Sequence, residues 1–289
     1  MIYQKIFRIF IETIVKNFLH RLSKKYIFEK KYDQLVVYSF DSVSTEINLN
    51  GIYEKNFLFF LKNYLKDNMY NTENEIAVDI GAYIGNHSIF LSKIYKKILS
   101  FEPHPLSFKI LQLNCENFPN INIFNYACSN INKKSFLRQK HTNIGGSFIS
   151  DGSNPRDVRV TLVQLDNFLK NLNPKEKIGL IKIDVEGHEI ETLKGCVDTI
   201  KKDKPIITFE LKNLKTNKNN SLPETISFLK TLGYQKFYTI DQKFNLNYSS
   251  KNLFFLSIGF LIKMFIKDKT EMKEIVVFEN IEYQNIIAF

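Results

Sequence analysis

The stretch that most constrains the fold runs from residue 76 to residue 85 and reads Ile-Ala-Val-Asp-Ile-Gly-Ala-Tyr-Ile-Gly. A short apolar run, typical of a buried strand, leads into a turn with Gly81 and Gly85, and a helical pattern starts near Asn86. Glycine lacks a Cβ, so these two positions allow the backbone to come close to a ligand. The stretch therefore predicts a strand–turn–helix unit with a ligand-binding turn.

The residue types in this turn favour a cationic ligand over a dinucleotide. A dinucleotide fingerprint has a second glycine where this chain has Tyr83, and Asp79 would repel a pyrophosphate. S-adenosylmethionine carries a sulfonium and an ammonium group, which suit an acidic turn. Glu102 ends a second predicted strand 21 residues after Gly81, where an acid can hold the two hydroxyls of an adenosine ribose. We therefore expect S-adenosylmethionine as the cofactor.

Strands and helices alternate between residues 75 and 256, which predicts an α/β fold with a mostly parallel sheet and helices on both faces. Ligands of such sheets bind at the carboxyl ends of the strands. Four acidic residues fall at predicted strand ends, and these are Asp79, Glu102, Asp184 and Glu210. Four acids on one rim predict an active site there.

The basic charge of the chain is concentrated at its N-terminal end. Residues 1–31 contribute +6 of the net charge of +10. Apolar residues recur every four positions within residues 1–28, which predicts a basic amphipathic helix. Two interpretations of this helix stay open. It lies on an anionic membrane surface as a peripheral contact, or it packs on its own domain or a second subunit.

We expect three parts in the chain. Residues 1–50 form the basic helix and one or two short strands, residues 51–256 form the main domain, and residues 257–289 form a tail outside the sheet. We expect residues 129–159 to be irregular and residues 160–163 to form a strand, and the last strands of the domain are expected at Phe237–Ile240 and Leu253–Leu256. No signal peptide is visible, so we expect a cytoplasmic protein, on the inner face of the membrane if the helix binds lipid. The three cysteines have no metal-binding spacing and indicate reduced thiols.

Three motifs resemble those of the FkbM family of S-adenosylmethionine-dependent methyltransferases. They are Val78-Asp79-Ile80-Gly81-Ala82-Tyr83-Ile84-Gly85-Asn86-His87-Ser88, Phe101-Glu102-Pro103-His104-Pro105 and Ile181-Lys182-Ile183-Asp184-Val185-Glu186-Gly187-His188-Glu189. The resemblance spans residues 74–256 and implies a Rossmann-like class I methyltransferase fold with a mostly parallel seven-stranded sheet. Tyr83 departs from the Asn that the family often has at this position.

The resemblance also implies which residues bind the cofactor, and these are Asp79, Gly81, Ala82, Gly85, Asn86, Glu102, Tyr126 and Ala127. By this resemblance, Gly81 and Gly85 shape the turn under the methionine moiety, and Asp79 faces the amino end of the cofactor. Glu102 binds the ribose hydroxyls, while Tyr126 and Ala127 line the adenine.

The catalytic residues can be argued from the reaction. Methyl transfer from a sulfonium needs in-line attack, and a hydroxyl nucleophile must lose its proton. Asp184 ends the strand beside the central one, so we expect it to act as base or to accept the hydrogen bond of the acceptor hydroxyl, with Glu186 and Glu210 orienting. Alternatively, Glu186 caps a helix, or the three acids gather a divalent cation, although we expect no metal. His188 is expected to face outward, and His87 either touches the site or packs locally.

The resemblance implies acceptors among secondary metabolites and glycans. We expect O-methyl transfer to a sugar hydroxyl of a surface polysaccharide or lipid-linked glycan. RNA ribose 2′-O-methylation is an alternative, because Lys182, Asp184 and Glu210 superficially match a Lys/Asp/Glu set, but the basic residues cluster elsewhere and no nucleic-acid partner is expected. A cofactor-binding interaction module without catalysis, docking through residues 1–28, is the alternative from another class.

Overall fold

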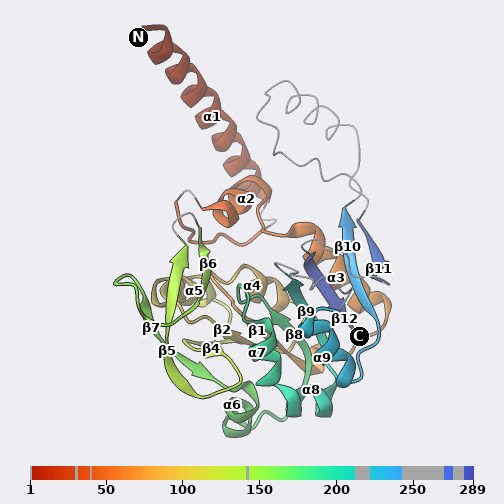
Figure 1. Cartoon of the computed structure of the whole chain (residues 1–289). Coiled ribbons are helices and arrows are strands. Elements are labelled where there is room, and N and C mark those ends of the chain that lie inside the picture. The colour runs from red at the N-terminus through yellow and green to blue at the C-terminus, as the bar shows by residue number, and fades with distance from the viewer. Residues whose placement is uncertain are drawn as a thin grey trace.

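A large, mostly parallel sheet of eight strands forms the centre of the molecule (Figure 1). The computed structural model describes residues 2–29, 32–39, 41–140, 143–211, 222–242, 270–275 and 283–289. In sheet order, the strands are β11 (Thr270–Glu274), β10 (Phe237–Gln242), β12 (Tyr283–Ala288), β9 (Ile206–Leu211), β8 (Lys177–Ile183), β1 (Glu75–Ile80), β2 (Lys97–Phe101) and β3 (Ile121–Phe124). β12 runs antiparallel to β9 and β10, and β11 runs antiparallel to β10.

The central strands β1 and β8 are almost continuous apolar runs because helices cover both of their faces. They pair in parallel, with Asp79 opposite Lys182 and Ile80 opposite Ile183. Ile80 is also opposite Phe101 of β2. The carboxyl ends of β1, β2 and β8 are therefore level, and the turns that follow them meet at one edge of the sheet.

Helices lie on both faces of the sheet, which confirms the predicted α/β fold class (Figure 1). The sheet has eight strands instead of the expected seven, because β11 and β12 of the C-terminal segment join it. The helices are α2 (Ser42–Asn50), α3 (Lys55–Asp67), α4 (Asn86–Leu91), α5 (Pro105–Cys115), α6 (Leu165–Leu172), α7 (Glu189–Lys194), α8 (Val197–Asp203) and α9 (Glu224–Thr231). Apolar side chains of α6, α7, α8 and α9 pack into one core cluster, and those of α3 and α4 pack into another on different residues of the same strands. α3 owes its place to Leu58, Leu61 and Leu65, which recur on one helix face and are fully buried.

A second, smaller sheet stands beside the large one. It has the order β4-β7-β5-β6, with β4 at Ala127–Cys128, β5 at Lys133–Lys140, β6 at Asn143–Ser150 and β7 at Val158–Val163. The strand expected at 160–163 is present, but the expectation of an irregular segment over 129–159 was wrong. β5 begins with two lysines, ends with Arg-Gln-Lys and has little apolar alternation, so pairing with β6 and β7 decides its conformation.

Two predictions at the ends of the chain were wrong. Residues 42–50 form α2 instead of a strand, with Asp41 accepting a hydrogen bond from the backbone N–H of Ser44 and Gly51 ending the helix at φ +79°. The C-terminal segment was expected outside the sheet, yet β12 fills the gap between β9 and β10. β12 pairs with two strands that are distant in sequence, so no local sequence pattern indicates its place in the sheet. The expected strand at Leu253–Leu256 lies outside the described residues.

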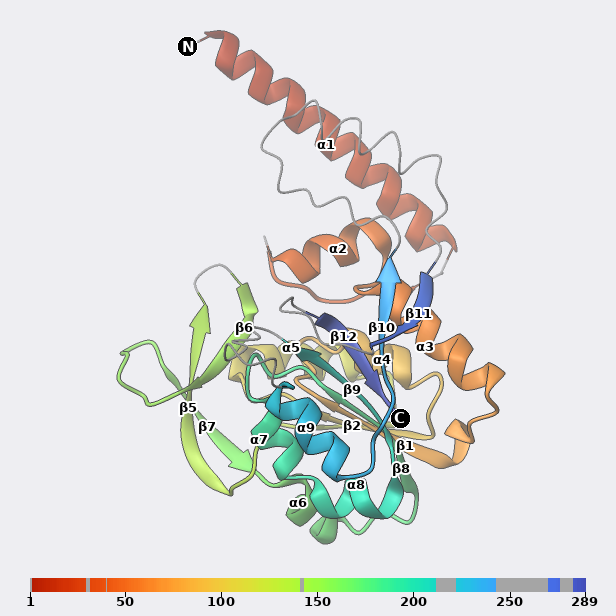
Figure 2. The same ribbon diagram turned by 45° about the vertical axis from the view of Figure 1, so that its right-hand side comes forward.

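The first helix, α1 (Ile2–Glu29), projects away from the rest of the molecule and meets it beside α2 (Figure 1 and Figure 2). The predicted helix is thus present, and its described side chains, at residues 5–21 and 24, are exposed. The alternative in which these side chains pack on the domain does not describe this structure. No helix in the described ranges combines the length and apolar character that crossing a bilayer requires.

Candidate active site

A cavity opens where the turns after β1, β2 and β8 meet the last residues of β9. Its wall includes nine of the predicted site residues, and these are Gly81, Ala82, Asn86, Glu102, Tyr126, Ala127, Asp184, Glu186 and Glu210. Ser42 and Val43 of α2 and Leu137, Ser147 and Ile149 of the small sheet complete it. Asp79 and Gly85 are not part of the wall. The structure therefore brings most of the predicted residues together, while their individual roles stay predictions.

Gly81 and Gly85 are required by contacts inside the protein. Both have positive φ, and a Cβ on Gly81 would lie 1.8 Å from the backbone oxygen of Asp184. A Cβ on Gly85 would lie 2.8 Å from the side chain of Leu111 in α5. The backbone N–H groups of Gly81 and Ala82 both donate to the carbonyl of Phe101, which holds the turn against β2. Close approach of two strand ends and a helix is thus enough to require both glycines, and the approach of a ligand to this turn stays a prediction.

Asp79 is fully buried in an ion pair. Its Oδ1 lies 3.1 Å from the Nζ of Lys182, and its Oδ2 accepts a hydrogen bond of 2.6 Å from Ser88. Burial alone would raise the pKa of Asp79, but the charges of Lys182 and His87 and the hydrogen bonds of Ser88 and Lys182 together outweigh it and lower the pKa. The carboxylate is therefore engaged beneath the turn, and it does not face the cavity where a cofactor amino group was expected.

Lys182 connects this buried pair to the cavity. Its Nζ lies 3.6 Å from the Oδ2 of Asp184, whose side chain is 33% exposed. The neighbouring carboxylates Asp79 and Asp184 overcome burial and raise the pKa of Lys182 above its usual value, so the ammonium stays charged. The contact gives the Asp184 carboxylate a fixed cationic neighbour on its inner side, while its other side lines the cavity.

Glu102 lies at the end of β2 with both carboxylate oxygens bonded to backbone. Oε2 accepts from the N–H of Tyr83 at 2.9 Å, and Oε1 accepts from the N–H of His104 at 2.8 Å. Burial nevertheless raises the pKa of Glu102 to about 8. Each oxygen keeps a second lone pair, so the carboxyl group can still receive a pair of vicinal hydroxyls from the cavity side.

The turn after β8 carries backbone strain. Glu186 has φ +53° and Gly187 has φ +97°, and a left-handed conformation is uncommon for glutamate. Such strain is typical of functional turns. Glu186 lines the cavity, as does Val185 before it. The α7 helix begins after His188, its N-cap residue, whose side chain makes no cap bond, and the role of Glu186 stays a prediction.

A buried group beside the cavity was missed by sequence reasoning. His87, which lines the cavity, has its Nε2 3.1 Å from the Oε2 of Glu54, and the other Glu54 oxygen accepts from Asn285 of β12. Burial raises the pKa of Glu54, but the hydrogen bond and charge of His87 outweigh it and lower the pKa. Tyr53 also lines the cavity, and its backbone exchanges two hydrogen bonds with the Asn86 side chain. No local pattern marks Glu54, because three distant segments bring it there.

His188 faces the cavity, contrary to the expectation that it points outward. Its Nε2 lies 2.9 Å from the hydroxyl of Ser129. Burial lowers the pKa of His188, which favours the neutral ring. Tyr126, expected beside the adenine, packs edge-to-face with Phe168 of α6. In the part of the chain that the structure describes, no three His, Cys, Asp or Glu side chains are grouped to hold a metal ion.

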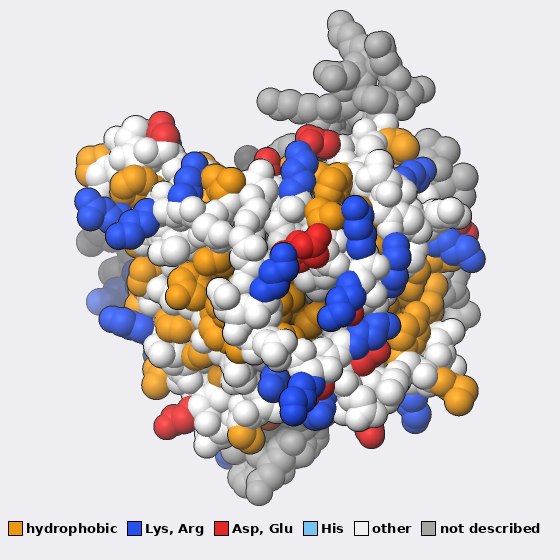
Figure 3. Space-filling model, turned by 90° about the horizontal axis from the view of Figure 1, so that it is seen from below, with side chains coloured by type: hydrophobic (Ala, Val, Ile, Leu, Met, Phe, Trp, Pro, Cys, Tyr) orange, Lys and Arg blue, Asp and Glu red, His pale blue; other side chains and the backbone are white. Residues whose placement is uncertain are grey.

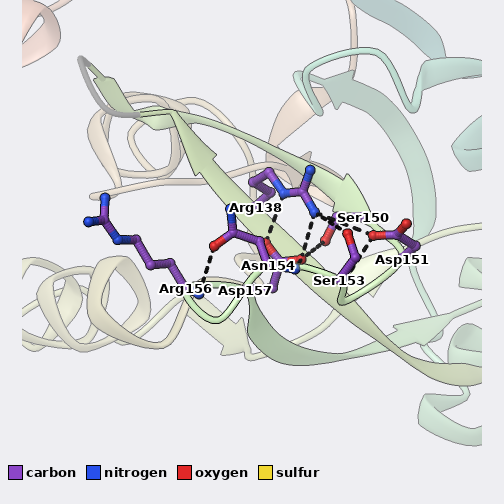
Figure 4. A network of polar contacts seen from close by, with 7 residues as sticks. All are labelled: Arg138, Ser150, Asp151, Ser153, Asn154, Arg156 and Asp157. Carbon is purple, nitrogen blue, oxygen red and sulfur yellow. Dashed lines mark hydrogen bonds and ion pairs between the residues drawn. The ribbon is translucent and has the colours of Figure 1, made fainter.

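The small sheet that forms the outer wall is fixed by one polar network (Figure 4). Arg138 of β5 binds both carboxylate oxygens of Asp157 at 3.0 Å, and it also reaches Asp151 and Ser153. Ser150, the last residue of β6, donates to Asp157 as well. The Arg138 bonds are the main cause that holds the pKa of Asp157 at about 2. The network ties the turn between β6 and β7 to β5, and so positions the strands that carry Leu137 and Ile149.

The cavity wall is acidic. Asp184, Glu186 and Glu210 line it, and Glu102 adds a fourth carboxyl group. Among the described residues, the wall includes two histidines and no Lys or Arg. Such a wall attracts a cationic sulfonium donor and disfavours an anionic acceptor.

Comparison with known proteins agrees with this geometry. The family model described as "Methyltransferase FkbM domain" matches residues 79–236. This range runs from the end of β1 to the residue before β10. The hexuronic acid methyltransferase AglP of Haloferax volcanii is 26% identical over 129 residues, covering 44% of this chain and 52% of that protein. Methyltransferase 1 of Beauveria bassiana is 25% identical over 154 residues, covering 44% of this chain and 60% of that protein. The matches thus span about half of these relatives' length.

Solved structures show distant similarity. The methyltransferase FkbM from Methylobacillus flagellatus is 16% identical with a TM-score of 0.45, and the match covers 80% of this chain and 56% of that one. A fibrillarin from Aeropyrum pernix with natively bound S-adenosyl-L-methionine is 13% identical with a TM-score of 0.36, covering 57% and 58% of the two chains.

Proposed function

This chain belongs to the FkbM methyltransferase family, whose cofactor is S-adenosylmethionine, and we propose that it transfers the methyl group to a hydroxyl of a sugar acceptor. The observation that carries the proposal is the position of Asp184. Its backbone oxygen packs against Gly81 of the turn predicted to hold the methionine moiety, and its side chain lines the same cavity. The carboxylate therefore stands next to the place where a methyl group would be transferred.

In the proposed reaction, the acceptor hydroxyl attacks the methyl carbon in line as the carbon–sulfur bond breaks. The hydroxyl proton passes to the Asp184 carboxylate, either directly or through a water molecule. Lys182 keeps Asp184 oriented from the inner side. Glu102 would hold the ribose hydroxyls, and Tyr126 would line the adenine.

A glycan acceptor is supported by the relative from Haloferax volcanii, which is named for hexuronic acid methylation. The acidic wall favours a neutral sugar over a carboxylate-bearing one in this chain, because Asp184, Glu186 and Glu210 would repel a second anion. We therefore propose a neutral sugar hydroxyl in a surface polysaccharide or a lipid-linked glycan.

The RNA alternative has weaker support. RNA binding needs a basic surface around the site. On the face that carries α6 and α8, Lys and Arg side chains are interspersed with acidic and apolar ones (Figure 3). Lys170 there pairs with Asp198, and Lys202 lies beside Asp203. This face is at the opposite end of the strands from the cavity, so its charge does not serve an RNA acceptor at Asp184.

The proposal is tested with radiolabelled S-adenosylmethionine and a panel of neutral glycans, uronic-acid glycans and RNA. Asp184→Asn should lower the rate of transfer to a neutral glycan by about 100-fold or more, because the proton acceptor is lost. Binding of S-adenosylhomocysteine, measured by titration calorimetry, should remain. Asp198→Asn makes the same chemical change on exposed α8 and should leave the rate unaltered.

Three results would contradict the proposal. Full activity of Asp184→Asn would remove the assigned base. Methylation of RNA but of no glycan would replace the acceptor. Binding of cofactor with no transfer to any acceptor would favour the interaction module.

A further inference from the structure

α1 exposes a long row of large apolar side chains. Nine of them in residues 6–19 are at least 40% exposed, and they are Ile6, Phe7, Ile9, Phe10, Ile11, Ile14, Val15, Phe18 and Leu19. Phe7 is 67% exposed and Phe10 is 60% exposed. A helix of 28 residues that stands away from the protein body cannot bury this surface against its own domain (Figure 2). Contiguous apolar surface of this kind marks an interaction site.

Four apolar and four charged side chains in the first two thirds of α1 lie on different faces of the helix. Phe7, Ile11, Ile14 and Phe18 follow one another at spacings of four, three and four residues, which places them on one face. Lys5, Arg8, Glu12 and Lys16 follow at spacings of three, four and four and share another face. The other exposed apolar side chains, Ile9 and Leu19 among them, lie around the rest of the helix, so the apolar surface of α1 is broad and the helix as a whole is only weakly amphipathic.

The charge of α1 identifies the surface that it fits. Among its described side chains, five are basic and one is acidic; the basic ones are Lys5, Arg8, Lys16, Arg21 and Lys24. The acid, Glu12, is already paired with Arg8 at 2.8 Å. Arg21 and Lys24 lie toward the end that meets α2, and their long side chains can extend to lipid phosphates. A second copy of α1 would bring like charges together, whereas anionic lipid headgroups complement them.

We infer that α1 docks this protein on an anionic lipid bilayer, with the apolar face in the acyl boundary and the basic side chains at the headgroups.

The docked helix would also orient the cavity. Residues 32–39, between α1 and α2, are held against the domain, since Val36 exchanges hydrogen bonds with Asn114 of α5 and Tyr38 stacks on Tyr83 at 5.6 Å. α2 follows directly, and its Ser42 lines the cavity. A bilayer under α1 therefore lies on the side of the molecule where α2 borders the cavity. The inference about the acceptor rests on the proposed function. A cavity held next to the bilayer indicates a lipid-linked glycan presented at the membrane.

The test is flotation of the full chain with vesicles of phosphatidylcholine alone or with phosphatidylglycerol added. The chain should float with the anionic vesicles, less with neutral ones, and less again at high salt, which screens the basic side chains. Phe7→Ser/Phe10→Ser should lower the partition coefficient by about tenfold or more, because two large apolar side chains no longer enter the bilayer. Leu106→Ser/Leu113→Ser removes two exposed apolar side chains of α5 and should not change it.

Three outcomes distinguish docking through α1 from the proposed function. Equal flotation of the Phe7→Ser/Phe10→Ser variant and the wild type would overturn docking through α1. A dimer in sedimentation velocity without lipid, lost in that variant, would show that a second copy covers the helix and would equally overturn it. Flotation does not require turnover, so normal flotation of a chain that methylates no glycan would contradict the proposed function alone.

Discussion

The backbone of Asp184 lies close to Gly81, so a substitution of Gly81 tests how closely the ends of β1 and β8 approach each other. Gly81→Ala should lower the free energy of unfolding by about 3 kcal/mol or more, since a Cβ 1.8 Å from a carbonyl oxygen forces β1 and β8 apart. Gly187 has a similar positive φ, but nothing lies within 4 Å of its added Cβ. Gly187→Ala should therefore lose only about 1–2 kcal/mol. Urea titration measures both, and equal losses would refute the steric explanation.

The raised pKa of Glu102 predicts a pH-dependent cofactor affinity. In the empty site the group is protonated below about pH 8, whereas ribose hydroxyls donate best to the ionised carboxylate. The affinity for S-adenosylhomocysteine should therefore rise with pH, by up to about tenfold per pH unit below pH 8, and then level off. Calorimetry between pH 6 and pH 9 measures this. Glu102→Gln should bind weakly with a flatter profile, and a flat wild-type profile would contradict the assignment.

Residues at strand ends could be predicted from the sequence, and residues brought in by the fold could not. Glu102, Asp184 and Glu210 follow apolar runs, so their common position on one rim follows from the parallel sheet. Asp79 also follows such a run, but it pairs with Lys182 on the neighbouring strand. This pairing depends on the register of β1 against β8, which cannot be read from the sequence. Glu54 reaches the site through a turn before α3, which no spacing in the sequence indicates.

At the scale of elements, the polar network of Arg138 should keep the outer wall of the cavity in shape. Arg138→Leu should free the turn between β6 and β7, because Asp157 and Asp151 lose their common donor. Hydrogen exchange in residues 150–157 should become faster, and the KM for the acceptor should rise more than kcat falls. Arg156→Leu is the matched control, because Figure 4 shows its side chain directed away from the network. Unchanged exchange in Arg138→Leu would show that strand pairing alone holds the turn.

Elements with strong periodicity or long apolar runs were predictable, whereas elements that depend on partners were not. α3 and β8 belong to the first group. β5 and β6 belong to the second, because their polar sequences form strands only as a paired hairpin. α2 had usable signals, a capping Asp41 and a terminating Gly51, which the expectation of strands overlooked.

At the scale of the whole molecule, the topology of β1, β2, β3, β8 and β9 follows from alternating strands and helices joined by right-handed connections. The position of the remaining strands required knowledge of long-range pairing. The same holds for α1. Its helical pattern is local and could be predicted, whereas its projection from the body depends on the domain offering no surface that covers its apolar side chains.

The insertion of β12 between β9 and β10 has a consequence for synthesis on the ribosome. β9 and β10 are translated well before residues 283–288, yet neither pairs with the other in the finished sheet. A nascent chain that has reached only β10 therefore holds two strands with bare backbone edges facing an empty slot. Such edges recruit strands from other chains, so this interval of translation is when the protein depends most on chaperones.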